Sequence, residues 1–199
     1  MSKSGLGLFL LALWMMVAPA SADVWSIDIE GAIGPAKADH LARGLQQASD
    51  AKAPLVILRI DTPGGLDLSM REMIKEILAS QIPVVGYVSP SGARAASAGT
   101  YLLYATHIAA MAPGTNLGAA TPVQIGAPGL PSLPNPKGQG SDDDAGGEKM
   151  PEPATAMERK IVNDAVAYIQ SLAQLRQRNG EWAELAVRQG ASLSAEDAL

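Results

Sequence analysis

The sequence predicts an α/β protein built on a mostly parallel sheet. Two segments, residues 54–60 and 83–88, are almost continuously apolar, which is typical of strands buried on both faces of a parallel sheet. The segment between them is amphipathic, with one apolar stripe at helical spacing that is formed by Met70, Met73, Ile74, Ile77 and Leu78. A strand, a helix and a second strand in this order favour a parallel arrangement.

The segments before this unit extend the pattern. Residues 24–29 alternate and are rich in β-forming residues, so they predict a strand. Residues 37–50 predict a helix with an apolar face, and the glycine-containing segment 31–34 separates the two. In the helix that follows the turn 61–65, the polar positions are expected to face water, and these are Arg71, Glu72, Lys75 and Glu76.

The segments after residue 88 are less regular. The tract 89–99 consists almost entirely of small residues, and a helix is expected to begin within it. Residues 107–111 predict a short strand, and 113–116 predict a turn. Residues 124–153 carry six prolines and an acidic run without apolar periodicity, so we expect a solvated, flexible loop there.

Helical order returns near residue 155. Thr155 and Glu158 form a T-x-x-E capping pattern that predicts a helix start, and Asn179-Gly180 predicts its end. A second short helix is expected at 181–189, and Ser194 is a candidate cap for a further one.

The first 22 residues have the layout of a secretory signal peptide. Lys3 precedes the apolar run 6–17, and the small-x-small sequence 20–22 follows it. The alternative is an uncleaved N-terminal anchor. Cleavage would leave one domain, 23–199, outside the cytoplasm, and because the sequence stops inside an expected element we predict that it is a truncated domain.

Composition excludes several kinds of chemistry. The 199 residues include no cysteine and only two histidines, so disulfides, a thiolate metal site and a cysteine nucleophile are excluded and a histidine-rich metal centre is not expected. The net charge of −5 predicts no nucleic-acid partner. No glycine spacing fits a dinucleotide or phosphate-binding loop, and we expect no cofactor and no metal.

Two features are candidates for an acyl-transfer site. Gly64 and Gly65 follow a buried strand, where backbone N–H groups could stabilise an oxyanion, although taken alone they favour a tight strand-to-helix turn without a ligand. Ser97 lies in the small-residue tract near the expected helix start, where it could act as a nucleophile or simply cap the helix.

A serine nucleophile needs a base, and the sequence leaves several open. His107 lies on an apolar strand and His40 on a helix exposed to water, so neither is favoured. Lysine can serve when burial favours its neutral form, and the lysines after Ser97 are Lys137, Lys149 and Lys160. Only Lys160 lies in an expected helix, but its position opposite the apolar stripe is also that of an ordinary surface lysine.

Several motifs together resemble one family. Residues 61–65, 96–101 and 111–122, with the later segments 160–169 and 192–199, resemble the NfeD family of membrane-bound, ClpP-class serine proteases, which are often encoded beside a stomatin-like protein. The resemblance covers nearly all of 23–199 except the loop 124–153.

The resemblance implies a ClpP/crotonase-like fold of repeated strand–strand–helix units and a Ser-Lys dyad. By position, Ser97 matches the nucleophile and Lys160 the general base, while Gly64, Gly65 and the backbone of Ala98 match the oxyanion region. The segment 118–122, where the histidine-dependent relatives carry their base, contains no histidine.

The resemblance also implies a function and partners. We expect an extracytoplasmic serine endopeptidase that cleaves hydrophobic segments of a stomatin-like membrane protein and assembles as a homodimer or larger. In its full-length form it would be membrane-bound, with membrane helices and an OB-like β-barrel. The alternatives are a non-catalytic scaffold module that binds a stomatin-like protein and an acyl-CoA enzyme of the crotonase type.

Overall fold

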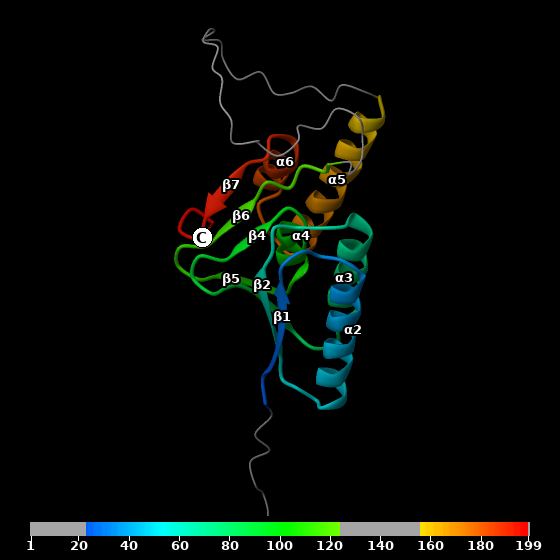
Figure 1. The fold of residues 1–199 in the computed structure, drawn as a ribbon, viewed down its shortest axis with the longest axis vertical. Coiled ribbons are helices and arrows are strands. Elements are labelled where there is room, and N and C mark those ends of the chain that lie inside the picture. The colour runs from blue at the N-terminus through cyan, green and yellow to red at the C-terminus, as the bar shows by residue number, and fades with distance from the viewer. Residues whose placement is uncertain (1–22, 124–155, 199) are drawn as a thin grey trace, which may run out of the picture.

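The core of the molecule is a parallel sheet of four strands (Figure 1). The structure, a computed structural model, describes residues 23–123 and 156–198. The strands lie in the order β1-β2-β3-β5, with every neighbouring pair parallel. Their bounds are Trp25–Glu30 for β1, Val56–Asp61 for β2, Val84–Val88 for β3 and Ile108–Met111 for β5. The predicted parallel α/β arrangement is therefore confirmed.

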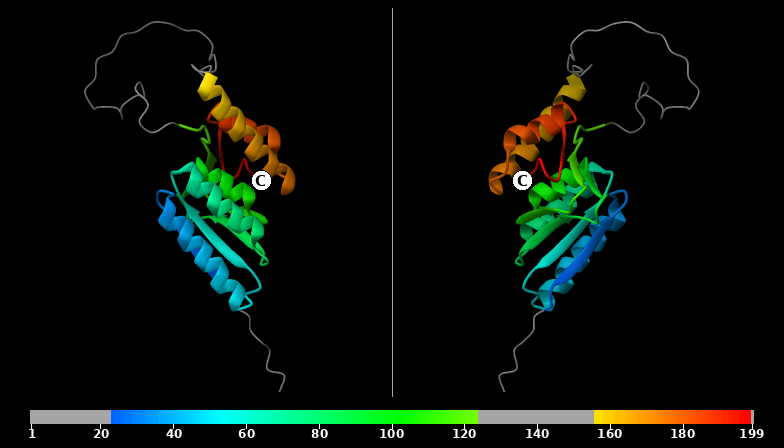
Figure 2. Two further views of the ribbon diagram at one scale, coloured as in Figure 1. Left: turned by 90° about the vertical axis from the view of Figure 1, so that its right-hand side faces the viewer. Right: turned by 90° about the vertical axis from the view of Figure 1, so that its left-hand side faces the viewer.

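Two helices, α2 (Pro35–Asp50) and α3 (Asp67–Ala79), cover one face of this sheet, as Figure 2 shows. Four of the five residues predicted for the apolar stripe of α3 are buried. Leu78 is 39% exposed, so its assignment to the buried stripe is wrong. Arg71, which was expected to face water, is only 30% exposed, because its guanidinium contacts Asp164 and Tyr168 of helix α5 (Ala156–Leu175).

A second, smaller sheet was not predicted. It contains β4 (Arg94–Ala96), β6 (Asn116–Gly118) and β7 (Ser192–Ser194), in that order. Single β-bridges between Ile33 and Gly65 and between Thr62 and Ala95 continue the same pairing. The core strands β3 and β5 are thus each followed by a short crossing strand and then a helix, which agrees with repeated strand–strand–helix units.

Helix α4 (Ala98–Ala105) lies at the centre of the molecule, and all eight of its residues are buried. A buried helix must satisfy its last carbonyl groups within the protein. Arg178 donates from Nη1 to the carbonyl of Leu103 at 2.6 Å, and Arg176 donates from Nε to the carbonyl of Ala105 at 2.9 Å. Both arginines come from the connection after α5, so this connection fixes the C-terminal end of α4.

The two last helices are α5 (Ala156–Leu175) and α6 (Gly180–Arg188). The first helix ends earlier than predicted, and Gln177 takes a left-handed backbone conformation (φ 56°) just after it. Asn179 begins α6 instead of ending α5, since its side chain accepts a hydrogen bond from the N–H of Trp182 at 2.9 Å. The first turns of α5 project from the body of the molecule (Figure 2).

Three predictions fall on residues that the structure does not describe. The signal segment 1–22 and the loop 124–153 lie outside the described residues, as does Thr155 of the predicted capping pattern. Among the described residues, no helix is both long enough and apolar enough to cross a membrane.

The contact between Gly65 and Ile33 gives a test of the fold. A Cβ atom at Gly65 would overlap the backbone carbonyl oxygen of Ile33, which cannot move without breaking the bridge between the two segments. We expect Gly65→Ala to cost about 3 kcal/mol in unfolding free energy, as overpacking against backbone does. Denaturant unfolding measures this cost.

Gly180→Ala is the matched control, because its new Cβ would lie 3.8 Å from Ala173, an ordinary contact. It should be neutral or slightly stabilising. Equal stability of the two variants would show that Gly65 does not pack closely against the backbone of Ile33.

Candidate active site

A pocket of about 290 Å³ opens where α3 and α4 begin. Its walls also include the segment after β6 and Ala165 of α5. Met70, Ala98, Tyr101 and Ala165 form buried apolar parts of the lining. Ser97 and Gly65 line the same pocket, so the structure brings these two predicted site residues together.

Ser97 occupies a strained turn between β4 and α4. Its backbone has φ 52° and ψ −118°, a conformation that residues with a side chain rarely adopt. Its N–H donates to the carbonyl of Gly118 at 2.8 Å, which holds the turn in place. Its side chain makes no capping hydrogen bond, so the alternative in which the hydroxyl caps α4 is wrong. Strained residues of this kind cluster at functional sites.

Gly64 lies directly beside Ser97. A Cβ atom at Gly64 would lie 2.6 Å from Cβ and 3.0 Å from Oγ of Ser97, and the φ of +109° also disfavours any other residue. The N–H of Gly64 donates to Oγ1 of Thr62 at 3.0 Å, so this amide is already used. Gly64 therefore leaves room for the side chain of Ser97. The prediction that its N–H would donate to an oxyanion requires a free amide, and this amide already donates to Thr62.

Two other amides remain available near Ser97. Among the described residues, the N–H of Gly65 has no hydrogen-bond acceptor. Ala98 is the first residue of α4, where backbone N–H groups have no partner within the helix and carry partial positive charge. Free N–H groups on both sides of a serine are what an oxyanion requires.

Lys160 lies on the exposed first turns of α5. The structure does not bring it into contact with Ser97, and it makes no hydrogen bond or ion pair with any described residue. Its spacing from Asp164 places both on one side of the helix, and Asp164 binds Arg71 in the pocket wall. Lys137 and Lys149 lie outside the described residues.

Both histidines lie away from the pocket lining. Nδ1 of His107 accepts a hydrogen bond from the N–H of Val84 at 3.1 Å, at the N-terminal ends of the parallel strands. Gly64 follows the C-terminal end of β2, so His107 lies at the other end of the sheet. Burial, together with the charges of Arg176 and Arg178, lowers the pKa of His107. His40 is exposed on α2. The sequence-based preference against both is consistent with these positions.

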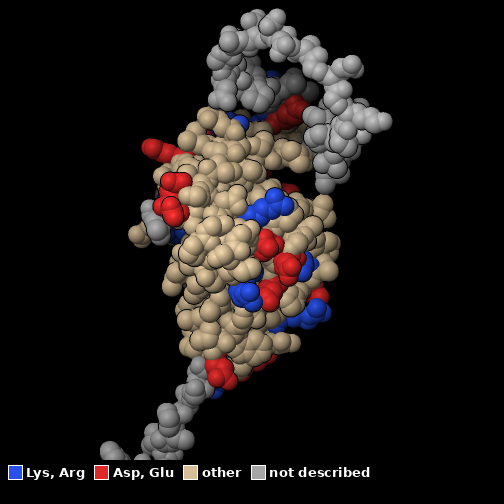
Figure 3. All heavy atoms as spheres, turned by 60° about the vertical axis from the view of Figure 1, so that its left-hand side comes forward, with Lys and Arg blue, Asp and Glu red and all other residues tan. Residues whose placement is uncertain are grey.

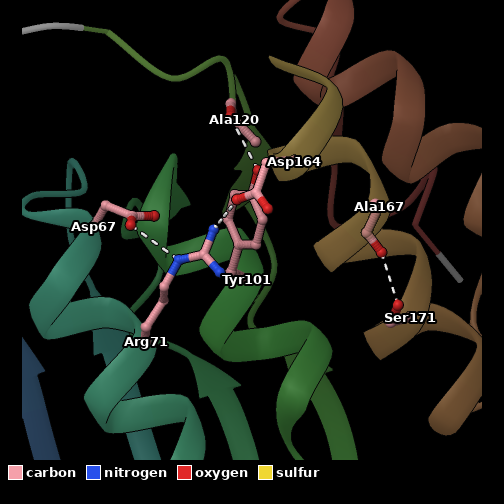
Figure 4. A network of polar contacts seen from close by, with 7 residues as sticks. All are labelled: Asp67, Arg71, Tyr101, Ala120, Asp164, Ala167 and Ser171. Atoms are coloured by element: carbon pink, nitrogen blue, oxygen red, sulfur yellow. Dashed lines mark hydrogen bonds and ion pairs between the residues drawn. The ribbon is translucent and has the colours of Figure 1, made fainter. Parts of the chain in front are cut away.

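One charged group at the pocket was missed by the sequence reasoning. Arg71 reaches from α3 to α5 and binds two carboxylates, those of Asp67 and Asp164, as Figure 4 shows. Behind it, the hydroxyl of Tyr101 points to the carbonyl of Ala120 at 3.5 Å. Burial, with a smaller contribution from Asp67, raises the pKa of Tyr101, so its hydroxyl stays neutral.

Figure 3 shows the charged side chains on one face of the molecule. On the face shown in Figure 3, lysine and arginine side chains lie among aspartate and glutamate side chains, within a broad uncharged area. Among the described residues, no group of three histidine, aspartate or glutamate side chains is placed to hold a metal ion.

Solved structures of similar proteins show the class of fold. The 1510-N membrane-bound stomatin-specific protease, in a variant with a serine changed to alanine, is 36% identical with a TM-score of 0.72, over 90% of this chain and 76% of that one. A variant of the same protease with a lysine changed to alanine, in complex with a substrate peptide, is 35% identical with a TM-score of 0.73, over 90% and 72%. The chain is thus an α/β protein with the ClpP-like fold, and the predicted fold class is confirmed.

The family follows from sequence matches. The model of the NfeD1b N-terminal domain matches residues 23–128, and the chain belongs to this family. It is 37% identical over 176 residues to "Membrane-bound protease PH1510" of Pyrococcus horikoshii, covering 88% of this chain and 35% of that protein. It is 45% identical over 119 residues to "Membrane protein NfeD1b" of Bacillus subtilis, covering 58% and 26%. The chain therefore spans about a third or less of these relatives.

The contact between Gly64 and Ser97 can be tested chemically. We expect Gly64→Ala to abolish labelling of Ser97 by a fluorophosphonate probe, because the new methyl group would displace the serine side chain. Gly92→Ala is the control, since Gly92 also has a positive φ (+88°) but has no heavy atom within 4 Å of the added Cβ.

Both variants should lose about 1–2 kcal/mol of stability from backbone strain. Only Gly64→Ala should lose labelling, and labelling that survives in it would contradict the assigned role of Gly64.

Proposed function

We propose that this chain is the proteolytic domain of a serine endopeptidase, with Ser97 as the nucleophile and Lys160 as the general base. The observation that carries the proposal is the strained turn of Ser97 at the start of a buried helix, beside Gly64 and at the edge of a pocket. The two similar solved structures, one a serine variant and one a lysine variant with a substrate peptide, support a serine and a lysine as the active pair.

The proposed reaction is acyl transfer through a serine ester. The neutral amine of Lys160 takes the proton from Oγ of Ser97 as Oγ attacks the carbonyl carbon of the cleaved bond. The N–H groups of Gly65 and Ala98 donate to the oxyanion that forms. Lys160 returns the proton to the leaving amine. It then takes a proton from the water that attacks the ester and gives it to Oγ of Ser97 as the carboxylic acid product leaves.

Lys160 must approach Ser97 for this reaction. In the structure its side chain is exposed to water on the first turns of α5. Covering the start of α5 with substrate or with a second copy of the chain would remove water from the amine and favour its neutral form. Assembly as a homodimer or larger would supply such a cover.

The proposed substrates are hydrophobic segments of a stomatin-like membrane protein. The pocket lining is largely apolar, and its rim carries the exposed side chains of Leu66 and Val123, which are 47% and 71% exposed. An apolar peptide would bury these side chains and gain binding energy from doing so. The similar solved protease is described as stomatin-specific, which supports the same class of partner.

The proposed location is the extracytoplasmic face of the membrane. The support is the signal-like sequence of residues 1–22 and the membrane-bound relatives. The longer protein would be membrane-bound, and the domain would extend over 23–199.

Cleavage assays with single variants test the mechanism. We expect Ser97→Ala to reduce cleavage of an apolar peptide library to background while unfolding at the wild-type temperature. Lys160→Ala should lower kcat by a factor of about 10²–10⁴, the usual contribution of a general base. Product analysis by mass spectrometry measures both.

Lys75→Ala, an exposed lysine on α3, is the matched control and should keep full activity. Loss of activity in Lys149→Ala but not in Lys160→Ala would identify a different base. A wild-type protein that binds a stomatin-like protein without cleaving any peptide would instead support the scaffold alternative.

A further inference from the structure

Arg71 connects the pocket wall to α5. Its Nε donates to Oδ2 of Asp67 at 2.9 Å, within α3, and its Nη2 donates to Oδ2 of Asp164 at 2.6 Å, across to α5. The guanidinium carbon also lies 4.4 Å from the ring centre of Tyr168, one turn further along α5. The side chain is 30% exposed, so the group is partly shielded from water.

The part of α5 that Arg71 holds is next to the proposed base. Residues 156–160 are all exposed, and the first buried residue of the helix is Ala165. Two hydrogen bonds join consecutive residues of α5 to other helices, from Arg71 to Asp164 and from Arg188 to Asn163 at 3.2 Å. Only the first lies on the pocket side, because Arg71 lines the pocket.

We propose that Arg71 is a positioning residue that fixes α5 at Asp164, beside the pocket of Ser97, and so sets the direction from which Lys160 approaches. The inference rests on the proposed function. Lys160 precedes Asp164 by four residues and shares its side of the helix, so fixing Asp164 fixes the direction from which Lys160 approaches.

Arginine suits this role because its planar group binds two carboxylates and stacks on an aromatic ring at once. A lysine at the same position would offer a point charge without that geometry. A single guanidinium thus fixes three side chains, Asp67 from the first turn of α3 and Asp164 and Tyr168 from the middle of α5.

The test compares two kinds of arginine variant in the 199-residue chain. In Arg71→Met the volume is kept and both ion pairs are lost. We expect kcat for an apolar fluorogenic peptide to fall about tenfold with KM within about twofold, because misplacing a reacting group by a fraction of an ångström slows the chemical step without weakening binding. The rate of fluorophosphonate labelling of Ser97 should fall by the same factor.

Variants of Asp164, which binds Arg71, and of Arg176, at the far end of α5, complete the experiment. Asp164→Asn should match Arg71→Met, the double variant should be no slower than either single one, and Asp164→Glu should recover part of kcat. Arg176→Met is the matched control, because Arg176 anchors the other end of α5 to α4. It should lower the unfolding temperature with kcat unchanged when both are assayed well below unfolding.

Three results would overturn the inference. Wild-type kcat and labelling in Arg71→Met would show that the arginine positions nothing. A rise in KM alone would show that it binds substrate, and an equal loss of kcat in Arg176→Met would show a general effect of loosening α5. A wild-type chain that neither cleaves peptides nor reacts with the probe would overturn the proposed function, and the inference with it.

Discussion

Ser97 can hold its left-handed backbone because Gly64 leaves the space beside it empty. The two residues belong to turns that follow different strands, β2 and β4, so their approach depends on how the large sheet meets the small one. Gly118 completes the arrangement from β6, where its carbonyl accepts the N–H of Ser97. A larger side chain at Gly64 or Gly118 would therefore be destabilising, since the backbone segments pack directly against one another there.

Two buried threonines stabilise the turns around this contact. Oγ1 of Thr62 donates to the carbonyl of Gly31 at 2.7 Å and accepts the N–H of Gly64. Oγ1 of Thr100 donates to the carbonyl of Ala95 at 2.8 Å and accepts the N–H of Gly118 at 3.0 Å. Each hydroxyl thus satisfies two backbone groups, which keeps the glycine turns ordered without side chains of their own.

The sequence predicted the parts of the fold that depend on periodicity. The parallel strands and helices α2 and α3 follow from their apolar spacing, and the small-residue tract correctly placed a helix start near Ser97. Strands β4, β6 and β7 were missed because three residues are too few to show alternation.

Arg71 was misjudged for a different reason. A helical wheel identifies the polar side of α3, but it carries no information that a carboxylate 93 residues later binds the arginine there. The turn at Gln177 also lacks the glycine that usually marks a left-handed helix end. The pairing of Ser97 with Lys160 came from the family resemblance, since an exposed lysine has no signal of its own.

The anchoring of α5 at its far end has a mechanical consequence. The helix has 20 residues, and the hydrogen bond of Arg176 to Ala105 fixes the point just beyond its last turn. At a rise of 1.5 Å per residue, Lys160 lies about 24 Å from that point along the axis. The helix therefore acts as a lever: a tilt of about 5° at the anchored end moves the amine end by about 2 Å, comparable with the difference between a hydrogen bond and a lost contact. The ion pair of Arg71 with Asp164 lies only four residues from Lys160, so it resists this motion near the amine end even when the far anchor is weakened.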